Sequence, residues 1–221
     1  MQAMRELDPS HVQRRLAQSF ALDRLWRETM GLPEGDTKEP ALRRVAQVLE
    51  ASGTPYALIG GVAMQLHLRE PRTTLDIDLA VRRFAEIPHA ALAEAGFTHE
   101  GKFAHSDNWR APGEGPRAQR TAVQFSAEDV GIDDAVRRAR LVTAGDFQLR
   151  VAEPGDLIVL KLAAAEEGSR RPSKRRQDLM DIVALSETYP EATRGLSDLE
   201  RQVQALVAQL MVVGSRRGPE T

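Results

Sequence analysis

The apolar positions of the first fifty residues recur at the spacing of an α-helix. Asp8 and Pro9 are typical of an N-cap followed by the first helical residue. One apolar stripe then runs along the first predicted helix: Val12, Leu16, Phe20, Leu25 and Trp26. A linker of glycine, proline and acidic residues over 31–39 separates this helix from a second one. The second helix carries its own apolar stripe: Leu42, Val45, Ala46 and Leu49.

The remainder of the chain alternates short apolar runs with further helical patterns. The apolar runs predict strands over 56–59, 97–103, 121–125 and 147–151, and one more strand that contains Asp76, Ile77 and Asp78. Helical spacing predicts helices over 62–68, 88–95, 133–142, 154–167 and 176–187, and a last helix from Leu199 to Met211. This order predicts an α+β fold, with a small mixed β-sheet, flanking helices and a C-terminal helical bundle.

Composition narrows the class of protein. The chain has 221 residues and a net charge of −2, which argues against attraction of nucleic acid to its whole surface. It has no cysteine, which excludes disulfides, thiolate metal sites and cysteine nucleophiles. The N-terminus lacks the apolar segment of a secretory signal, and no apolar run approaches the roughly 20 residues of a membrane helix. We therefore expect a cytoplasmic protein with no membrane partner.

Asp76 and Asp78 are the leading candidates for chemistry. Alternation along a strand places both carboxylates on one face and Ile77 on the other. Two neighbouring carboxylates repel each other, so we expect a positive charge to hold them together. Mg²⁺ (or Mn²⁺) is a hard cation that suits carboxylate oxygens and carries the phosphates of a nucleoside triphosphate. The alternative is an exposed acidic pair at a strand edge without a ligand.

Gly60 and Gly61 lie at a predicted turn from strand to helix. Glycines at such a turn let backbone N–H groups approach a phosphate closely, near the positive end of the helix. Arg72 and Thr73 follow that helix and precede the two carboxylates. Their guanidinium and hydroxyl groups would contact and orient the same phosphate. These four residues are the candidate nucleotide-binding residues of the segment.

The ordered runs Gly-Gly-Val-Ala at 60–63 and Arg-Thr-Thr-Leu-Asp-Ile-Asp at 72–78 resemble the motifs of the nucleotidyltransferase superfamily, the DNA polymerase β-like fold. The closer resemblance is to the AbiEii-like nucleotidyltransferases, known mainly as toxins of toxin–antitoxin pairs, and it covers roughly residues 40 to 190. It implies transfer of a nucleoside monophosphate from a triphosphate to a hydroxyl, with Asp76 and Asp78 as metal ligands. It also implies a tRNA 3′ end as acceptor and an antitoxin protein as partner; a small-molecule acceptor is the rival.

Two downstream runs extend the resemblance. VAEPGDLIVLKLAAAEE carries Lys161, and RRQDLMDIVAL carries Asp178 and Asp181. The resemblance implies that Lys161 is a catalytic residue that contacts phosphate. The two aspartates share one face of a helix and would orient Lys161 or another basic side chain near the nucleotide. The alternatives are a surface lysine whose charged end reaches water, and acids that favour a helix N-terminus.

One carboxylate of the family pattern is missing from this chain. The family carries a third carboxylate on a later strand, and the matching position here is Ala122. Glu128 and Asp129 lie just beyond that strand and are the candidate substitutes. The alternative function is therefore a catalytically degenerate nucleotidyltransferase fold that acts as a nucleotide- or protein-binding module.

Other polar groups carry less specific signals. Residues 169–176 include five basic residues, which would contact phosphate or an RNA backbone, or remain a solvated loop. Trp109 is interpreted as a core or loop anchor in preference to a stacking platform for a base. The histidines show no paired metal spacing: His11, His67, His89, His99 and His105.

These patterns predict four segments. They are an N-terminal helical extension over 1–36, a nucleotidyltransferase core over 37–152, a C-terminal helical region over 153–214 and a disordered tail over 215–221. The active cleft would lie between the core and the helical region, with the carboxylates on the sheet side and Lys161 on the helical side.

Overall fold

The computed structural model describes residues 8–33, 36–68, 74–193, 201–202 and 205. Within them, one sheet has the strand order β3-β4-β5-β2-β1-β7-β6. The strands are β1 Tyr56–Ile59, β2 Asp76–Val81, β3 Thr98–Lys102, β4 Asp107–Arg110, β5 Ala122–Ser126, β6 Arg140–Ala144 and β7 Phe147–Val151. The pairs β2–β5 and β1–β7 are parallel and the other neighbours are antiparallel. The predicted α+β fold with a mixed sheet is confirmed.

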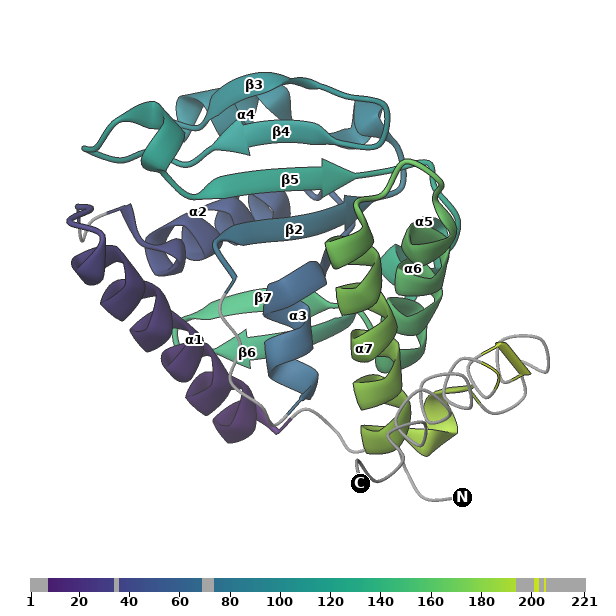
Figure 1. Ribbon diagram of the computed structural model, residues 1–221. Helices are drawn as coiled ribbons and strands as arrows, with labels where there is room; N and C mark the ends of the chain where they lie inside the picture. Colours follow the sequence, from purple (N-terminus) through teal and green to yellow (C-terminus); the bar gives the residue numbers. More distant parts are fainter. Residues whose placement is uncertain (1–7, 34–35, 69–73, 194–200, 203–204, 206–221) are drawn as a thin grey trace.

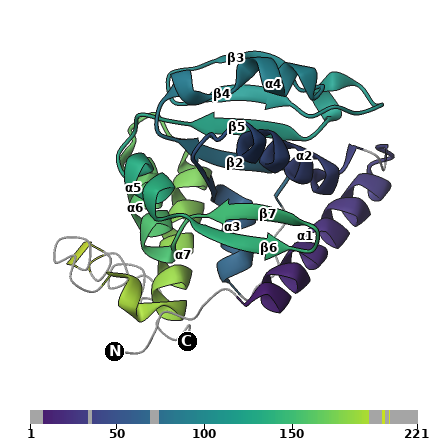
Figure 2. The same ribbon diagram turned by 180° about the vertical axis from the view of Figure 1, so that it is seen from behind.

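Helices cover both faces of this sheet. They are α1 Pro9–Thr29, α2 Lys38–Ala51, α3 Gly60–His67, α4 His89–Glu94, α5 Ile132–Arg138, α6 Pro154–Glu166 and α7 Pro172–Thr188. In Figure 1, α1 and α3 lie in front of the sheet and α2 lies behind it, and Figure 2 shows the arrangement from the other side. The helices α6 and α7 pack against each other and form the described part of the predicted C-terminal bundle. Within the part of the chain that the structure describes, every helix is too short or too polar to cross a membrane.

The two faces of the central strands differ in chemistry. Ile77 pairs with Val123, and Val123 pairs with Trp109 on the next strand. These three side chains are almost fully buried on the face that α2 covers. Burial of such apolar side chains stabilises the fold by roughly 1.5 to 3 kcal/mol each. The alternate positions of the same strands point to the opposite face, where the predicted carboxylates lie.

The first helix is part of the core. Asp8 caps it, because its Oδ1 accepts the backbone N–H of Ser10 at 3.0 Å. Near its C-terminal end, Arg27 donates from Nη2 to Thr121 Oγ1 at 3.1 Å, and Asp23 Oδ2 accepts the backbone N–H of Lys38 at 2.6 Å. The helix is thereby tied to the start of α2 and to the start of β5. The predicted domain boundaries remain a prediction.

Several predicted bounds were wrong. The run 133–142 is a helix only to Arg138, and β6 begins at Arg140 because Leu141 and Val142 suit a paired strand. The strand β4 was not predicted, since its polar residues hide the alternation. The helix α7 begins at Pro172, before the predicted 176. The last predicted helix and the predicted disordered tail lie mainly outside the described residues.

Candidate active site

Asp76 and Asp78 lie on β2, and their side chains share the face of the sheet that α3 covers. The register pairs Asp76 with Ala122 and Asp78 with Gln124 of β5. Both aspartates are partly exposed, whereas Ile77 between them is fully buried on the other face. The two aspartates therefore lie together on one side of the sheet, opposite the buried Ile77.

Gly60 and Gly61 lie directly against this pair at the start of α3. A Cβ on Gly60 would overlap the Asp78 carboxylate, and a Cβ on Gly61 would lie 2.6 Å from Thr74 Oγ1. Gly60 also has a φ of +62°, which favours glycine. The backbone N–H of Gly61 donates a hydrogen bond to Asp78. The diglycine thus lets the N-terminus of α3 touch the carboxylate, where its positive end favours negative charge.

Electrostatics distinguish Asp78 from an ordinary surface acid. Burial and the neighbouring charge of Asp76 raise the pKa of Asp78 from 3.8 to about 6. The Gly61 N–H and the positive charges of Lys161 and Lys174 act in the opposite direction. The positive charges near Asp78 therefore do not offset its burial and the negative charge of its neighbour.

Lys161 connects this site to the helical region. Its Nζ lies 3.0 Å from Asp178 Oδ1 and 2.6 Å from Asp181 Oδ2, both on α7. Arg170 Nε lies 2.5 Å from the other oxygen of Asp178. The Lys161 side chain is only 14 % exposed, so it is not a surface lysine with a free ammonium group. The structure brings Lys161, Asp178 and Asp181 together, and the charge of Lys161 acts on Asp78 of β2.

Lys38 is a further charged residue of the site, and the sequence analysis missed it. It is 1 % exposed, and its Nζ donates to the carbonyl of Thr74 at 2.7 Å. Burial lowers its pKa to about 8, while the nearby carboxylates of Asp23 and Asp76 oppose that shift. The signal in the sequence was its place four residues before Leu42, on the apolar stripe of α2.

Comparison with protein families identifies the chain. The family model described as nucleotidyl transferase AbiEii toxin, type IV TA system, matches residues 41–209. The chain belongs to this family. The protein is therefore a nucleotidyltransferase by family, as the motifs around Asp76 and Asp78 predicted.

Solved structures with a similar course of the chain include several nucleotidyltransferases. An antigenic nucleotidyltransferase-like protein from Paracoccidioides brasiliensis is 18% identical, with a TM-score of 0.46 over 78% of this chain and 93% of that one. JHP933 from Helicobacter pylori is 19% identical, with a TM-score of 0.46 over 79% and 77%. The lincosamide antibiotic adenylyltransferase LnuA, lincomycin-bound, is 12% identical, with a TM-score of 0.45 over 67% and 98%. None of the curated proteins compared with the chain matches it.

The position of the third carboxylate in this AbiEii-family chain is apolar. Ala122 is 8 % exposed and lies beside the first aspartate of β2. The proposed substitutes do not reach the pair, because both lie beyond the far end of β5. Glu128 Oε1 accepts the backbone N–H of Phe84 at 3.3 Å, and Asp129 Oδ2 lies 3.4 Å from His105 Nδ1. The expectation that Glu128 or Asp129 replaces the missing carboxylate was wrong.

Amide side chains extend the polar face next to the aspartates. Gln124 lies beside Asp78, and Asn108 of β4 lies beside Gln124 in the same row. Asn108 Oδ1 is buried and accepts no hydrogen bond from the described residues. Sequence reasoning missed this row, since it depends on the unpredicted strand β4.

Two predicted nucleotide-binding residues cannot be placed beside this site. Arg72 and Thr73 lie outside the described residues, which resume at Thr74. Thr74 Oγ1 faces the position of Gly61, so Thr74 itself lies next to the diglycine.

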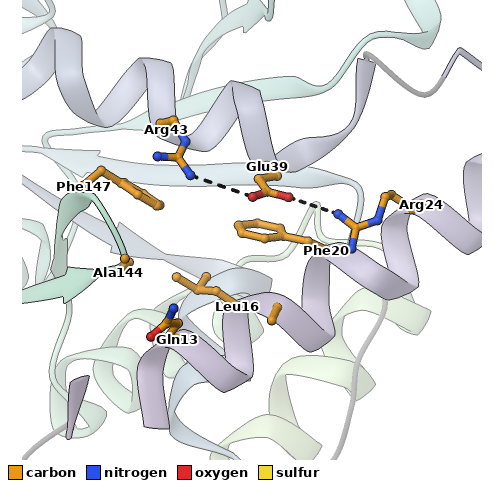
Figure 3. A pocket seen from close by; sticks show the side chains of 10 residues that line it. Gln13, Leu16, Phe20, Arg24, Glu39, Arg43, Ala144 and Phe147 are labelled. Carbon is orange, nitrogen blue, oxygen red and sulfur yellow. Dashed lines mark hydrogen bonds and ion pairs between the residues drawn. The ribbon is translucent and has the colours of Figure 1, made fainter. Parts of the chain in front are cut away.

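A hollow of about 330 Å³ lies between α1, α2 and the β6–β7 turn, and its lining includes none of the predicted site residues. Figure 3 shows Leu16 and Phe20 on its apolar side. Glu39 pairs with Arg24 at 3.1 Å and with Arg43 at 3.9 Å. The charged groups of its rim are therefore paired with one another.

Proposed function

We propose that this AbiEii-family protein transfers a nucleoside monophosphate from a nucleoside triphosphate to a hydroxyl acceptor, with Asp76 and Asp78 as ligands of Mg²⁺ or Mn²⁺. The observation that carries the proposal is the contact of Asp78 with the diglycine at the N-terminus of α3. A turn with only a structural role would not need glycine packed against the carboxylate of Asp78, which itself lies beside the carboxylate of Asp76.

The residues of the site fit a hard divalent cation. Asp76 and Asp78 offer only carboxylate oxygens, which such a cation prefers. Burial and the negative charge of Asp76 raise the pKa of Asp78, and a bound cation would offset both effects. When bound, it neutralises charge on the triphosphate and polarises the α-phosphorus.

Groups of the chain itself would position the triphosphate. The N-terminus of α3 lies against Asp78, so its backbone N–H groups would approach phosphates bound beside the aspartates. Arg72 and Thr73 would add a guanidinium and a hydroxyl from the preceding segment. Lys161, held by Asp178 and Asp181, would present its charge from the helical side of the cleft. Such positioning and neutralisation account for most of the catalysis of phosphoryl transfer.

The transfer itself is an in-line displacement at the α-phosphorus. A bond forms between the acceptor oxygen and the α-phosphorus, while the bond from that phosphorus to the bridging oxygen breaks and pyrophosphate leaves. The proton of the acceptor hydroxyl goes to solvent, because Ala122 stands where a third carboxylate would receive it. Gln124 and Asn108 offer amide groups that can hydrogen-bond the acceptor on the adjacent strands.

The distribution of positive charge favours an RNA acceptor, such as a tRNA 3′ end, over a small molecule. Residues 169–176 carry five basic side chains, most of them exposed, at the start of α7. Lys174 among them is near enough to Asp78 to lower its pKa. Basic groups around the reaction centre would bind the phosphates of an RNA strand and make binding dependent on salt.

An antitoxin protein is the expected second partner. The matching family model describes toxins of type IV toxin–antitoxin systems. Co-expression with the product of an adjacent gene should relieve growth inhibition by this protein. Equal growth inhibition with and without that product would argue against the pairing.

A labelling experiment tests the transfer. The protein is incubated with Mg²⁺, each of the four α-labelled nucleoside triphosphates and total tRNA, and the RNA is separated on a denaturing gel. We expect label from one or more triphosphates on RNA with the wild-type protein and none with Asp76→Asn. Label at equal intensity with both proteins, or label on neither, would contradict the proposal.

A second candidate is nucleotide binding without transfer, and the apolar Ala122 beside Asp76 favours it. A shift of the melting temperature by a triphosphate with Mg²⁺, in a protein that labels no acceptor, would support this candidate. Ala122→Asp then becomes the informative variant, because it restores a third carboxylate at the register position beside Asp76. Gain of transfer in that variant would show that the fold binds nucleotide but lacks the group that activates the acceptor.

A further inference from the structure

A second group of metal-ligating side chains lies at the other face of the sheet, near its β3 edge. It consists of His89 at the start of α4, His99 on β3 and Asp107 on β4, and their ligand atoms all lie within 4.8 Å of one another. His99 Nε2 lies 2.9 Å from Asp107 Oδ1, and His89 Nε2 lies 3.9 Å from Asp107 Oδ2. Each of the three residues comes from a different element, so only the folded chain assembles the group.

The strand register explains why these side chains meet. His99 pairs with Trp109 across β3 and β4, and Asp107 is two residues before Trp109 on the same face. The ring of His89 packs on both neighbours, with centroids 5.4 Å from His99 and 5.2 Å from Trp109. The helix α4 thereby places its first side chain over the carboxylate of β4.

Asp107 is a buried carboxylate with unusual partners. It is 2 % exposed, and its Oδ1 accepts the indole N–H of Trp109 at 2.7 Å. Among the described residues, the basic groups within 4.0 Å of it are the two imidazoles, with neither lysine nor arginine. A buried carboxylate is costly unless a positive charge compensates it. The indole leaves Oδ2 on the side of His89, available for a ligand.

We propose that His89, His99 and Asp107 bind a divalent transition-metal ion of the Zn²⁺ class. Two imidazole nitrogens and one carboxylate oxygen form a ligand set typical of such ions. With one ligand atom from each residue, the three atoms lie within 4.8 Å of one another, whereas those of a tetrahedral site lie about 3.3 Å apart, given bonds of about 2.0 Å, so small side-chain shifts would close the group around an ion. Trp109 holds the carboxylate from behind, as groups beyond the ligands do in metal sites.

The site is open on one side. The side chains of His89 and His99 are 48 % and 41 % exposed, so an ion can enter from solvent and a fourth position remains for water or another ligand. Because the ion would connect α4 to the edge strand β3 and to its neighbour β4, its binding would also stabilise this part of the fold.

This site is separate from the aspartates of β2. Asp107 pairs with Phe125, and Phe125 pairs with Leu79, which lies on the buried face of β2. Asp76 and Asp78 point to the opposite face. The proposal therefore does not rest on nucleotidyl transfer, and it concerns a different class of metal ion.

Titration with Co²⁺ tests the proposal, because a site with few ligands gives this ion visible absorption bands. Tag-free protein carrying Asp76→Asn, which removes one carboxylate ligand of the other candidate site, is treated with chelator and titrated with Co²⁺, then with Zn²⁺. We expect one equivalent to bind, with visible bands that Zn²⁺ abolishes. His89→Gln and His99→Gln should each weaken binding at least tenfold, and the exposed His105→Gln should leave it unchanged.

Two outcomes would overturn the proposal. One is absence of Co²⁺ bands up to millimolar metal in a protein whose near-UV circular dichroism shows native packing. The other is equal Co²⁺ affinity in the Asp76→Asn protein with and without His99→Gln. Trp109→Phe provides the second readout: it keeps the ring but removes the indole donor, and it should weaken Zn²⁺ binding about tenfold without loss of the fold.

Discussion

The carboxylate of Asp78 occupies the space that a side chain on Gly60 would need. A Cβ built on Gly60 would overlap the Asp78 side chain, and the backbone of Gly60 has a φ of +62°. Gly60 and Asp78 therefore pack directly against each other. The Asp78 carboxylate can occupy this position only because residue 60 has no side chain.

Gly60→Ala should displace Asp78 and abolish transfer. Gly53→Ala is the matched control, because Gly53 has the same φ of +62° but no atom within 4 Å of an added Cβ. Both variants carry the cost of a left-handed backbone, about 1 to 2 kcal/mol, and only Gly60→Ala adds the overlap. Urea denaturation should show a larger loss for Gly60→Ala. Equal losses, with transfer retained in both, would show that the contact with Asp78 is unimportant.

The stability of the metal-free protein should depend on the ionisation of Asp78. Its pKa in the folded protein is about 6, above the ordinary 3.8, so the folded state binds more protons than the unfolded chain between these values. The free energy of unfolding should therefore fall as pH rises from about 4 to 7, by at most about 3 kcal/mol from this group. Urea denaturation in EDTA at pH 4.5 and 7 measures it. Asp78→Asn should lack this part of the pH dependence, and an identical dependence in both proteins would contradict the raised pKa.

Lys161 and Asp181 should be strongly coupled. Lys161→Met leaves two nearly buried carboxylates without their shared cation, and we expect a loss of about 2 to 4 kcal/mol in the free energy of unfolding. The double variant with Asp181→Asn should recover at least 1 kcal/mol of that loss, which a double-mutant cycle measures. If Lys161 also contacts phosphate, transfer stays low in the double variant although stability returns. Recovery of both would assign Lys161 a structural role alone.

The ionisation of Lys38 should make the free energy of unfolding rise with pH at high pH, opposite to the effect of Asp78 at lower pH. Burial lowers its pKa from 10.5 to about 8, so the unfolded chain binds more protons than the folded protein between these values. The free energy of unfolding should rise with pH across this window, by up to about 3 kcal/mol from this group. Urea denaturation at pH 7.5 and pH 10 should show this rise in the wild type and a smaller one in Lys38→Met. A rise of equal size in both would mean that Lys38 keeps its ordinary pKa.

Local patterns predicted the elements that carry the aspartate pair. The strand 56–59, the glycine turn and the alternation of Asp76, Ile77 and Asp78 each follow from a few neighbouring residues. The predicted fold class was correct because it depends on the order of such locally determined strands and helices. The prediction that the helix continues to Val142 was wrong, because residues 140–142 are stabilised more by pairing with β7 than by one more helical turn.

Features that depend on long-range pairing were not predictable from the sequence. The strand β4 carries Asp107 and Asn108, and its role is apparent only once it pairs with β3 and β5. For the same reason the histidines at 89 and 99 showed no metal spacing, although the fold brings their rings together. Lys38 was assigned to a linker, because one charged residue before an apolar stripe does not reveal that it will be buried.

Binding of Mn²⁺ tests the central claim most directly, because its free ion has a strong paramagnetic resonance signal that disappears on binding. Two proteins are compared, and both carry His99→Gln to remove the second proposed site. One keeps both aspartates, and the other carries Asp76→Asn and Asp78→Asn. Both are measured in the presence of a non-hydrolysable triphosphate. We expect the protein with both aspartates to bind one or two Mn²⁺ ions beyond those held by the triphosphate alone, with at least tenfold higher affinity than the double variant. Equal loss of the free signal in the two proteins would contradict the account.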